Sequence, residues 1–85
     1  MKIIYADEFQ KRFKKLPKEI QRLYSLQEDR FQKDWNDPRL HVKRLKDHTL
    51  AFSFRITRGY RVLFNFIDKG VALFATIGNR KDIYR

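Results

Sequence analysis

The fold is decided by the stretch FSFRITRGYRVLFNFIDKGVALFATI, residues 52–77. Apolar side chains alternate with polar ones at Phe52, Phe54 and Ile56, and two β-rich runs follow at 60–67 and 71–77. A period of two residues is typical of strands with one buried face. The links between the runs, at residues 58–59 and 69–70, are short enough for tight hairpins. This stretch therefore predicts three consecutive antiparallel strands.

The residues before this stretch predict one further strand and two helices. Residues 2–6 alternate as a short strand, and Asp7 begins a capping-box pattern that Gln10 completes. Apolar residues then recur at helical spacing from Phe9, until Pro17 ends the first helix and begins a second one. The apolar stripe of the second helix is interrupted at Gln27. We expect an α+β fold of order β-α-α-β-β-β, in which both helices pack on one face of a four-stranded, mainly antiparallel sheet.

Length and charge limit the classes of function. A chain of 85 residues without cysteine predicts a single domain over residues 1–85 that has no disulfide bond. No segment resembles a signal peptide or a membrane span, so we expect a cytoplasmic protein. The formal net charge is +10, and residues 41–85 carry ten basic and three acidic side chains. Such a field attracts phosphates, which favours an RNA-binding function.

The second hairpin predicts which side chains share a face of the sheet. A two-residue loop at 69–70 pairs Val62 with Ile77, Phe64 with Ala75, and Phe66 with Leu73. That face is apolar and should lie under the helices. On the opposite face Arg61 should stand across from Gly78, with Arg80 at the same parity, so the two arginines should converge where the glycine leaves room for a ligand.

The first hairpin leaves two alternatives open. A two-residue loop at 58–59 puts Phe52 and Phe54 on the face of Arg61, and turns Arg55 toward the core. A three-residue loop or a bulge reverses this arrangement, because a shift of one residue moves every side chain of a strand to the other face.

The candidate chemistry rests on basic and tyrosine side chains. No His, Asp and Glu cluster has the spacing of metal ligands, and no glycine-rich phosphate loop is present, so we expect no metal and no cofactor. The remaining candidates are Lys46, Arg55, Arg61, Arg80 and Tyr84. In RNA cleavage the 2′-hydroxyl is the nucleophile, so an enzyme mainly aligns it, neutralises the developing charge and assists two proton transfers. The alternative is that these arginines are solvated surface residues and that the tyrosine is buried.

Three segments resemble the RelE/ParE toxin superfamily of type II toxin–antitoxin systems. They are residues 9–17 (FQKRFKKLP), 52–64 (FSFRITRGYRVLF) and 77–84 (IGNRKDIY). The order β-α-α-β-β-β is also the order of that family. The resemblance implies a metal-independent, often ribosome-dependent mRNA endonuclease that inhibits translation and is held inactive by an antitoxin protein.

The resemblance also implies roles for individual residues. Arg61 matches the arginine that contacts the scissile phosphate, and Arg80 matches a basic or histidine position near the C-terminus. Tyr84 matches a late tyrosine that stacks on or protonates the substrate, and Arg55 matches the arginine of a Ser-x-Arg variant. Lys46 matches the lysine of a Leu-Lys-Gly stretch whose glycine is replaced here by aspartate.

The chain departs from RelE where RelE has two lysines for proton transfer, since Phe52 and Phe54 align with them. We expect these rings to stack on bases if they lie on the face of Arg61. Lys43 and Arg44, in the basic connection 39–48, are further candidates for substrate contacts. Two alternatives stay open: a ParE-like inhibitor of DNA gyrase without nuclease activity, and a catalytically weakened RNA-binding relative.

Overall fold

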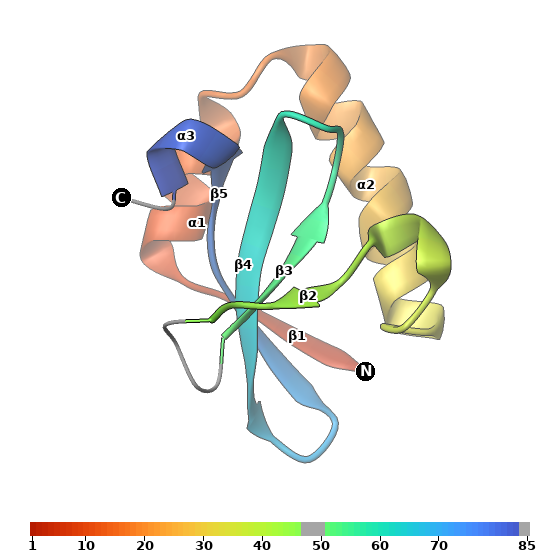
Figure 1. Cartoon of the computed structure of the whole chain (residues 1–85). Coiled ribbons are helices and arrows are strands. Elements are labelled where there is room, and N and C mark those ends of the chain that lie inside the picture. The colour runs from red at the N-terminus through yellow and green to blue at the C-terminus, as the bar shows by residue number, and fades with distance from the viewer. Residues whose placement is uncertain (47–50, 84–85) are drawn as a thin grey trace.

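The fold is a five-stranded sheet with two helices against one of its faces (Figure 1). The computed structural model describes residues 1–46 and 51–83. In chain order, its elements are β1 (Lys2–Tyr5), α1 (Asp7–Lys14), α2 (Lys18–Lys33), the 3-10 helix η1 (Pro38–Leu40), β2 (Lys43–Arg44), β3 (Phe52–Arg55), β4 (Tyr60–Asp68), β5 (Val71–Asn79) and α3 (Arg80–Ile83). The strands lie side by side in the order β1-β5-β4-β3-β2.

The predicted α+β class and the two N-terminal helices are confirmed, but the predicted number of strands is wrong. A fifth strand, β2, pairs antiparallel with β3 through only two residue pairs, and the sheet is mixed because β1 pairs parallel with β5. Two residues are too few to give a periodic signal in a sequence. None of the helices in the described residues combines the length and apolar character needed to cross a membrane.

The first helix starts differently from the predicted capping box. Ala6 is the N-cap residue, no side chain caps the helix, and Asp7 is already helical. The Gln10 side chain donates instead to the Tyr5 carbonyl oxygen at 3.1 Å. Asp7 and Glu8 lie in the first turn, where carboxylates interact favourably with the helix dipole.

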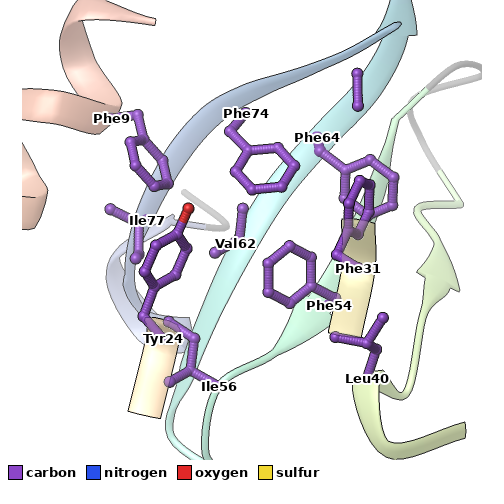
Figure 2. Close-up of a cluster of buried hydrophobic side chains, with 11 residues drawn as sticks. Phe9, Tyr24, Phe31, Leu40, Phe54, Ile56, Val62, Phe64, Phe74 and Ile77 are labelled. Atoms are coloured by element: carbon purple, nitrogen blue, oxygen red, sulfur yellow. The ribbon is translucent and has the colours of Figure 1, made fainter. Parts of the chain in front are cut away.

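The core is built around Phe31 of α2, which is fully buried beneath the sheet (Figure 2). Its ring centroid lies 5.5 Å from that of Phe54, 5.0 Å from that of Phe64 and 5.0 Å from that of Phe74. Phe9 of α1 packs on Phe74 at 5.8 Å. The helical face predicted from the spacing of Phe9 is therefore confirmed, and aromatic rings from three strands and two helices meet in one cluster.

The predicted register of β4 and β5 is correct over only half of the hairpin. Val62 pairs with Ile77 as expected, but Phe64 pairs with Phe74, because a bulge in β5 shifts the register by one residue. Phe74 therefore points into the core and is fully buried, and Leu73 lies on the other face. Placing Leu73 under the helices was wrong, because a bulge reverses the side-chain parity beyond it.

A three-residue loop decides between the two alternatives for β3. Arg55 pairs with Arg61, and the Ile56 amide donates to the Tyr60 carbonyl at 2.9 Å, so residues 57–59 form the loop. The Thr57 hydroxyl oxygen accepts hydrogen bonds from the Gly59 and Tyr60 amides, both at 3.2 Å, and so holds the turn. As a result Phe52, Phe54 and Ile56 face the helices, and Arg55 faces away from them.

The polar interruption in the stripe of α2 has a structural role. Gln27 is only 5% exposed, and its side-chain amide donates to the Arg55 carbonyl at 2.6 Å and to the Arg39 carbonyl at 3.0 Å. Arg30 donates to its side-chain oxygen at 2.8 Å. Gln27 therefore ties α2 to η1 and to β3 at the position of Arg55, and its buried polar atoms are satisfied.

Candidate anion site on the outer face of the sheet

The outer face of the sheet, defined here as the face turned away from α1 and α2, carries two polar rows. Residues directly opposite in antiparallel strands share a face. The first row therefore contains Arg55, Arg61 and Gly78, from β3, β4 and β5. The second row, two residues along the strands, contains Lys43, Ser53, Leu63 and Thr76. The three-residue loop is what brings Arg55 and Ser53 to the face of Arg61.

The two arginines of the first row place their positive charges close together at a position with little access to water. Arg61 is only 7% exposed, and Arg55 stands directly opposite it. The three ion pairs found within residues 1–46 and 51–83 join Arg12 to Glu8, Arg22 to Glu19, and Arg39 to Asp37, so neither arginine of the row takes part in them. Like charges directly opposite on a sheet destabilise it. Such a pair is suited to receive an anion.

Three buried polar atoms next to this charge have no hydrogen-bond partner among the described residues. They are the Arg55 Nε, the Ser53 hydroxyl and the Thr76 hydroxyl. Buried polar atoms are almost always paired, so each one without a partner calls for an explanation. The Arg55 N–H and the Ser53 hydroxyl, two residues apart on β3, can donate to the same oxyanion. Thr76 lies two strands away from Ser53, about 10 Å across the sheet, and can contact a second group of a larger ligand.

The space beside Gly78 is filled rather than open. A Cβ atom at this position would lie 3.1 Å from a side-chain methyl carbon of Ile83 and 3.4 Å from Nη1 of Arg12. Helix α3 follows β5 and contacts it (Figure 1). The Ile83 side chain of α3 is buried. The expectation that the glycine leaves room for a ligand is therefore wrong, because it makes room for α3 instead.

Arg80 does not follow the predicted parity. Helix α3 begins at Arg80, so the alternation of the strand ends before it, and its backbone amide donates to the Gly59 carbonyl at 2.8 Å. Its side chain is exposed and lines a separate hollow of about 330 Å³ with Arg58 and Lys81. The predicted convergence of Arg61 and Arg80 on one spot is therefore replaced by two neighbouring basic sites.

The other basic candidates are spread over different places. Lys43 lies in the second row, but the guanidinium of Arg44 lies over the Phe52 ring, 5.4 Å from its centroid, on the helix side. Lys46 is exposed beyond the point where Leu45 pairs with Ala51, and Ala51 is four residues from Arg55, about 13 Å of extended chain. The folding of the chain does not bring Lys46 to Arg61. Tyr84 lies outside the described residues.

Phe52 and Phe54 lie on the helix side of the sheet, so the condition under which they were expected to stack on bases, a place on the face of Arg61, is not met. Phe54 is fully buried, and Phe52 stacks on Phe64 with a centroid distance of 5.4 Å. The residues that face Arg61 are Ser53 and Arg55. Sequence reasoning missed Ser53 and Thr76 as candidates, although Ser53 shares the parity of Arg55 and would have followed from the three-residue loop.

Within residues 1–46 and 51–83, no group of three or more His, Cys, Asp or Glu side chains lies close enough together to hold a metal ion.

The fold of this chain is similar to that of several proteins of known structure. No family model matches this chain, and no curated protein matches it in sequence. A chain of the RelB-RelE antitoxin–toxin complex from Methanococcus jannaschii is similar with a TM-score of 0.77 and 24% identity, over 95% of this chain and 94% of that chain. The YoeB/ParE toxin from Agrobacterium tumefaciens gives a TM-score of 0.79 and 13% identity, over 94% and 99%. YafQ from Escherichia coli gives a TM-score of 0.74 and 15% identity, over 98% and 97%. The chain therefore has the RelE/ParE toxin fold, as the resemblance of its sequence predicted.

Proposed function

We propose that this protein is the toxin of a type II toxin–antitoxin system and that it cleaves mRNA as a metal-independent endoribonuclease. The observation that carries the proposal is the Arg55–Arg61 pair, which lies beside two buried hydroxyls and has no carboxylate partner among the described residues. The fold shared with RelE, YoeB and YafQ supports it.

The proposed mechanism assigns the arginines to transition-state charge. The 2′-hydroxyl attacks the adjacent phosphorus, and negative charge grows on the non-bridging oxygens as the 5′-oxygen leaves. Arg61 donates to these oxygens as a planar fork, and Arg55 adds a second cation from the neighbouring strand. Because Arg61 is already held in the sheet and shielded from water, little reorganisation accompanies the reaction.

Proton transfer needs a different group. A guanidinium stays protonated at all relevant pH values, so neither arginine serves as the base. Tyr84, the residue that follows α3 in the sequence, is our candidate for taking the proton of the 2′-hydroxyl and returning it to the leaving 5′-oxygen. Lys46 lies too far along the sheet from Arg61 for this role. Arg80 and Lys43 would bind flanking phosphates of the same RNA strand.

The proposed partners follow from charge and from the related complexes. Solved structures of this fold include RelB-RelE complexes from Methanococcus jannaschii and Pyrococcus horikoshii. We expect an antitoxin with an acidic segment that covers the outer face, since the chain carries a formal net charge of +10. The substrate would be mRNA on the ribosome, which places the activity in the cytoplasm.

The test is expression of the wild-type chain, Arg61→Ala and Arg22→Ala in a bacterial host. Arg22 is an exposed arginine of α2, paired with Glu19 on the opposite side of the molecule, so it is a matched control. Growth arrest and cleavage of translated mRNA, mapped by primer extension, should persist in Arg22→Ala. Loss of Arg61 should lower the cleavage rate by about 10²–10³. Cleavage that survives in a folded Arg61→Ala variant would remove this residue from the mechanism.

One observation favours a second candidate function. Among the described residues of the two rows, only Lys43 carries a titratable group besides the arginines, so no strong base lies next to Arg61. A ParE-like inhibitor of DNA gyrase needs no such base. Growth arrest with intact mRNA and trapped gyrase–DNA complexes would support that function. RNA binding without cleavage or arrest would instead indicate a catalytically weakened relative.

A further inference from the structure

A second site is suggested by a hollow on the opposite side of the molecule from the outer face. It measures roughly 360 Å³ and lies between β1, α1 and α2. Four aromatic rings line it, those of Tyr5, Phe9, Phe13 and Tyr24, and Glu28 of α2 contributes a carboxylate. The outer-face arginines do not line it, so it is independent of the function proposed above.

The rings of this hollow are held in a fixed arrangement. The Phe9 centroid lies 5.5 Å from that of Tyr5, 6.1 Å from that of Phe13 and 5.5 Å from that of Tyr24. Phe13 meets Tyr24 at 5.2 Å in an edge-on contact. Phe9 and Tyr24 also belong to the buried core, where other side chains pack around them (Figure 2). The hollow is therefore preformed, which lowers the entropic cost of filling it.

The carboxylate is oriented by both tyrosines. Oε1 of Glu28 accepts a hydrogen bond from the Tyr24 hydroxyl at 2.7 Å and another from the Tyr5 hydroxyl. Burial and these hydrogen bonds raise the pKa of Tyr5 to about 12, and burial raises the pKa of Tyr24 as well, so both hydroxyls remain protonated donors at neutral pH. No hydrogen bond or ion pair of the described residues engages Oε2 of Glu28.

Aromatic faces and a carboxylate select an organic cation. Ring faces carry negative electrostatic potential and attract cations within about 6 Å. A guanidinium suits this hollow better than an ammonium, because it is flat, more weakly hydrated and stacks on rings. The hollow is at the lower end of the range for small-molecule sites, about 300–1,000 Å³, so it accommodates one side chain with its methylene stem.

The surroundings point to a protein as the source of that cation. Met1, Ile4 and Tyr5 are exposed apolar side chains on or beside β1, with 40%, 39% and 37% of their surface accessible. β1 is also the edge strand of the sheet, which offers a backbone for a neighbouring extended segment. We propose that this hollow, lined by Tyr5, Phe9, Phe13, Tyr24 and Glu28, binds an arginine side chain presented by a protein partner that lies along β1.

Binding is tested by NMR titration of the whole chain with a capped arginine. The probe is Nα-acetyl-argininamide, and Nα-acetyl-citrullinamide is its uncharged counterpart of nearly the same shape. We expect saturable shifts of the Tyr24 and Glu28 amide signals with arginine, and at least about tenfold weaker binding of citrulline. Equal binding of the two probes, or no saturable shift with arginine, would overturn the proposal.

Two variants separate charge from shape. Glu28→Gln keeps an oxygen that can accept from both tyrosines, so the fold should persist while arginine binding weakens by about tenfold or more. Glu19→Gln removes a carboxylate from the exposed surface of the same helix and should leave binding unchanged. Unaltered binding in a folded Glu28→Gln variant refutes the assignment of the carboxylate. Stronger binding of spermidine than of acetyl-argininamide would make this a polyamine site and refute the protein partner.

Discussion

Replacing Arg61 by methionine should stabilise the protein and remove its response to anions. The side chain is 7% exposed and stands opposite Arg55 without a carboxylate partner in the described residues. Relief of a cross-strand like-charge contact contributes roughly 0.2–1 kcal/mol. Methionine also removes a poorly hydrated guanidinium and keeps a similar apolar stem, which should further raise the free energy of unfolding. We expect a total gain of about 1–2 kcal/mol in the free energy of unfolding, or roughly 4–16 °C in melting temperature.

A second measurement tests whether the outer face binds an anion, by comparing the stability of the wild type and the variant in phosphate. If phosphate binds between the two rows, the wild-type protein gains RT ln(1 + [L]/Kd), about 1.4 kcal/mol at ten times the dissociation constant. The Arg61→Met variant should lack this gain. Thermal unfolding is measured in phosphate and in sodium chloride of equal ionic strength, so that general salt effects cancel. Lys69→Met is the matched control, because Lys69 is exposed at the turn between β4 and β5.

Two results would refute this reasoning. A variant that is less stable than wild type at every ionic strength would mean that Arg61 makes a stabilising contact with its surroundings. A wild-type protein and an Arg61→Met variant with the same response to phosphate would mean that the anion binds elsewhere, for example in the hollow of Arg80.

Three further predictions concern the core, pH and the first hairpin. Phe64→Ala should lower the free energy of unfolding by about 3–5 kcal/mol, measured by urea denaturation. Leu26→Ala, at an exposed position, should change the free energy of unfolding little. Equal effects of the two substitutions would contradict the described core. The raised pKa of Tyr5 contributes stability that is fully present below its unfolded pKa of about 10 and is lost as the pH rises toward 12. Tyr5→Phe should therefore reduce the drop in the urea midpoint between pH 9 and pH 12. An identical drop in the variant and the wild type would argue against the contact with Glu28. Thr57→Val should cost about 1–2 kcal/mol by leaving two turn amides without their acceptor, whereas Thr57→Ser should retain most of the stability.

Local patterns were sufficient to predict the two N-terminal helices, the two hairpins and part of the register of the second hairpin. The helical spacing of apolar residues from Phe9 marked the face of α1 that packs against the core, and Pro17 marked the boundary between two helices. The pairing of Arg61 with Gly78 also followed from counting along the second hairpin. These features depend on residues near one another in the chain, where side-chain period and turn chemistry act directly.

The rest was decided by contacts between distant segments. A bulge in β5 puts Phe74 instead of Leu73 in the core. The bulge is a small local change of the backbone, and the packing of the Phe74 ring against Phe31 favours it. Strand β2 is too short to be recognised without β3 beside it, and α3 replaced a predicted cavity because Ile83 packs over Gly78. The candidate site changed for the same reason. Sequence alone proposed Arg61 as a candidate, and that role stays a prediction. Which neighbours share its face depended on a loop one residue longer than the shortest alternative, because a shift of one residue exchanges the two faces of a strand.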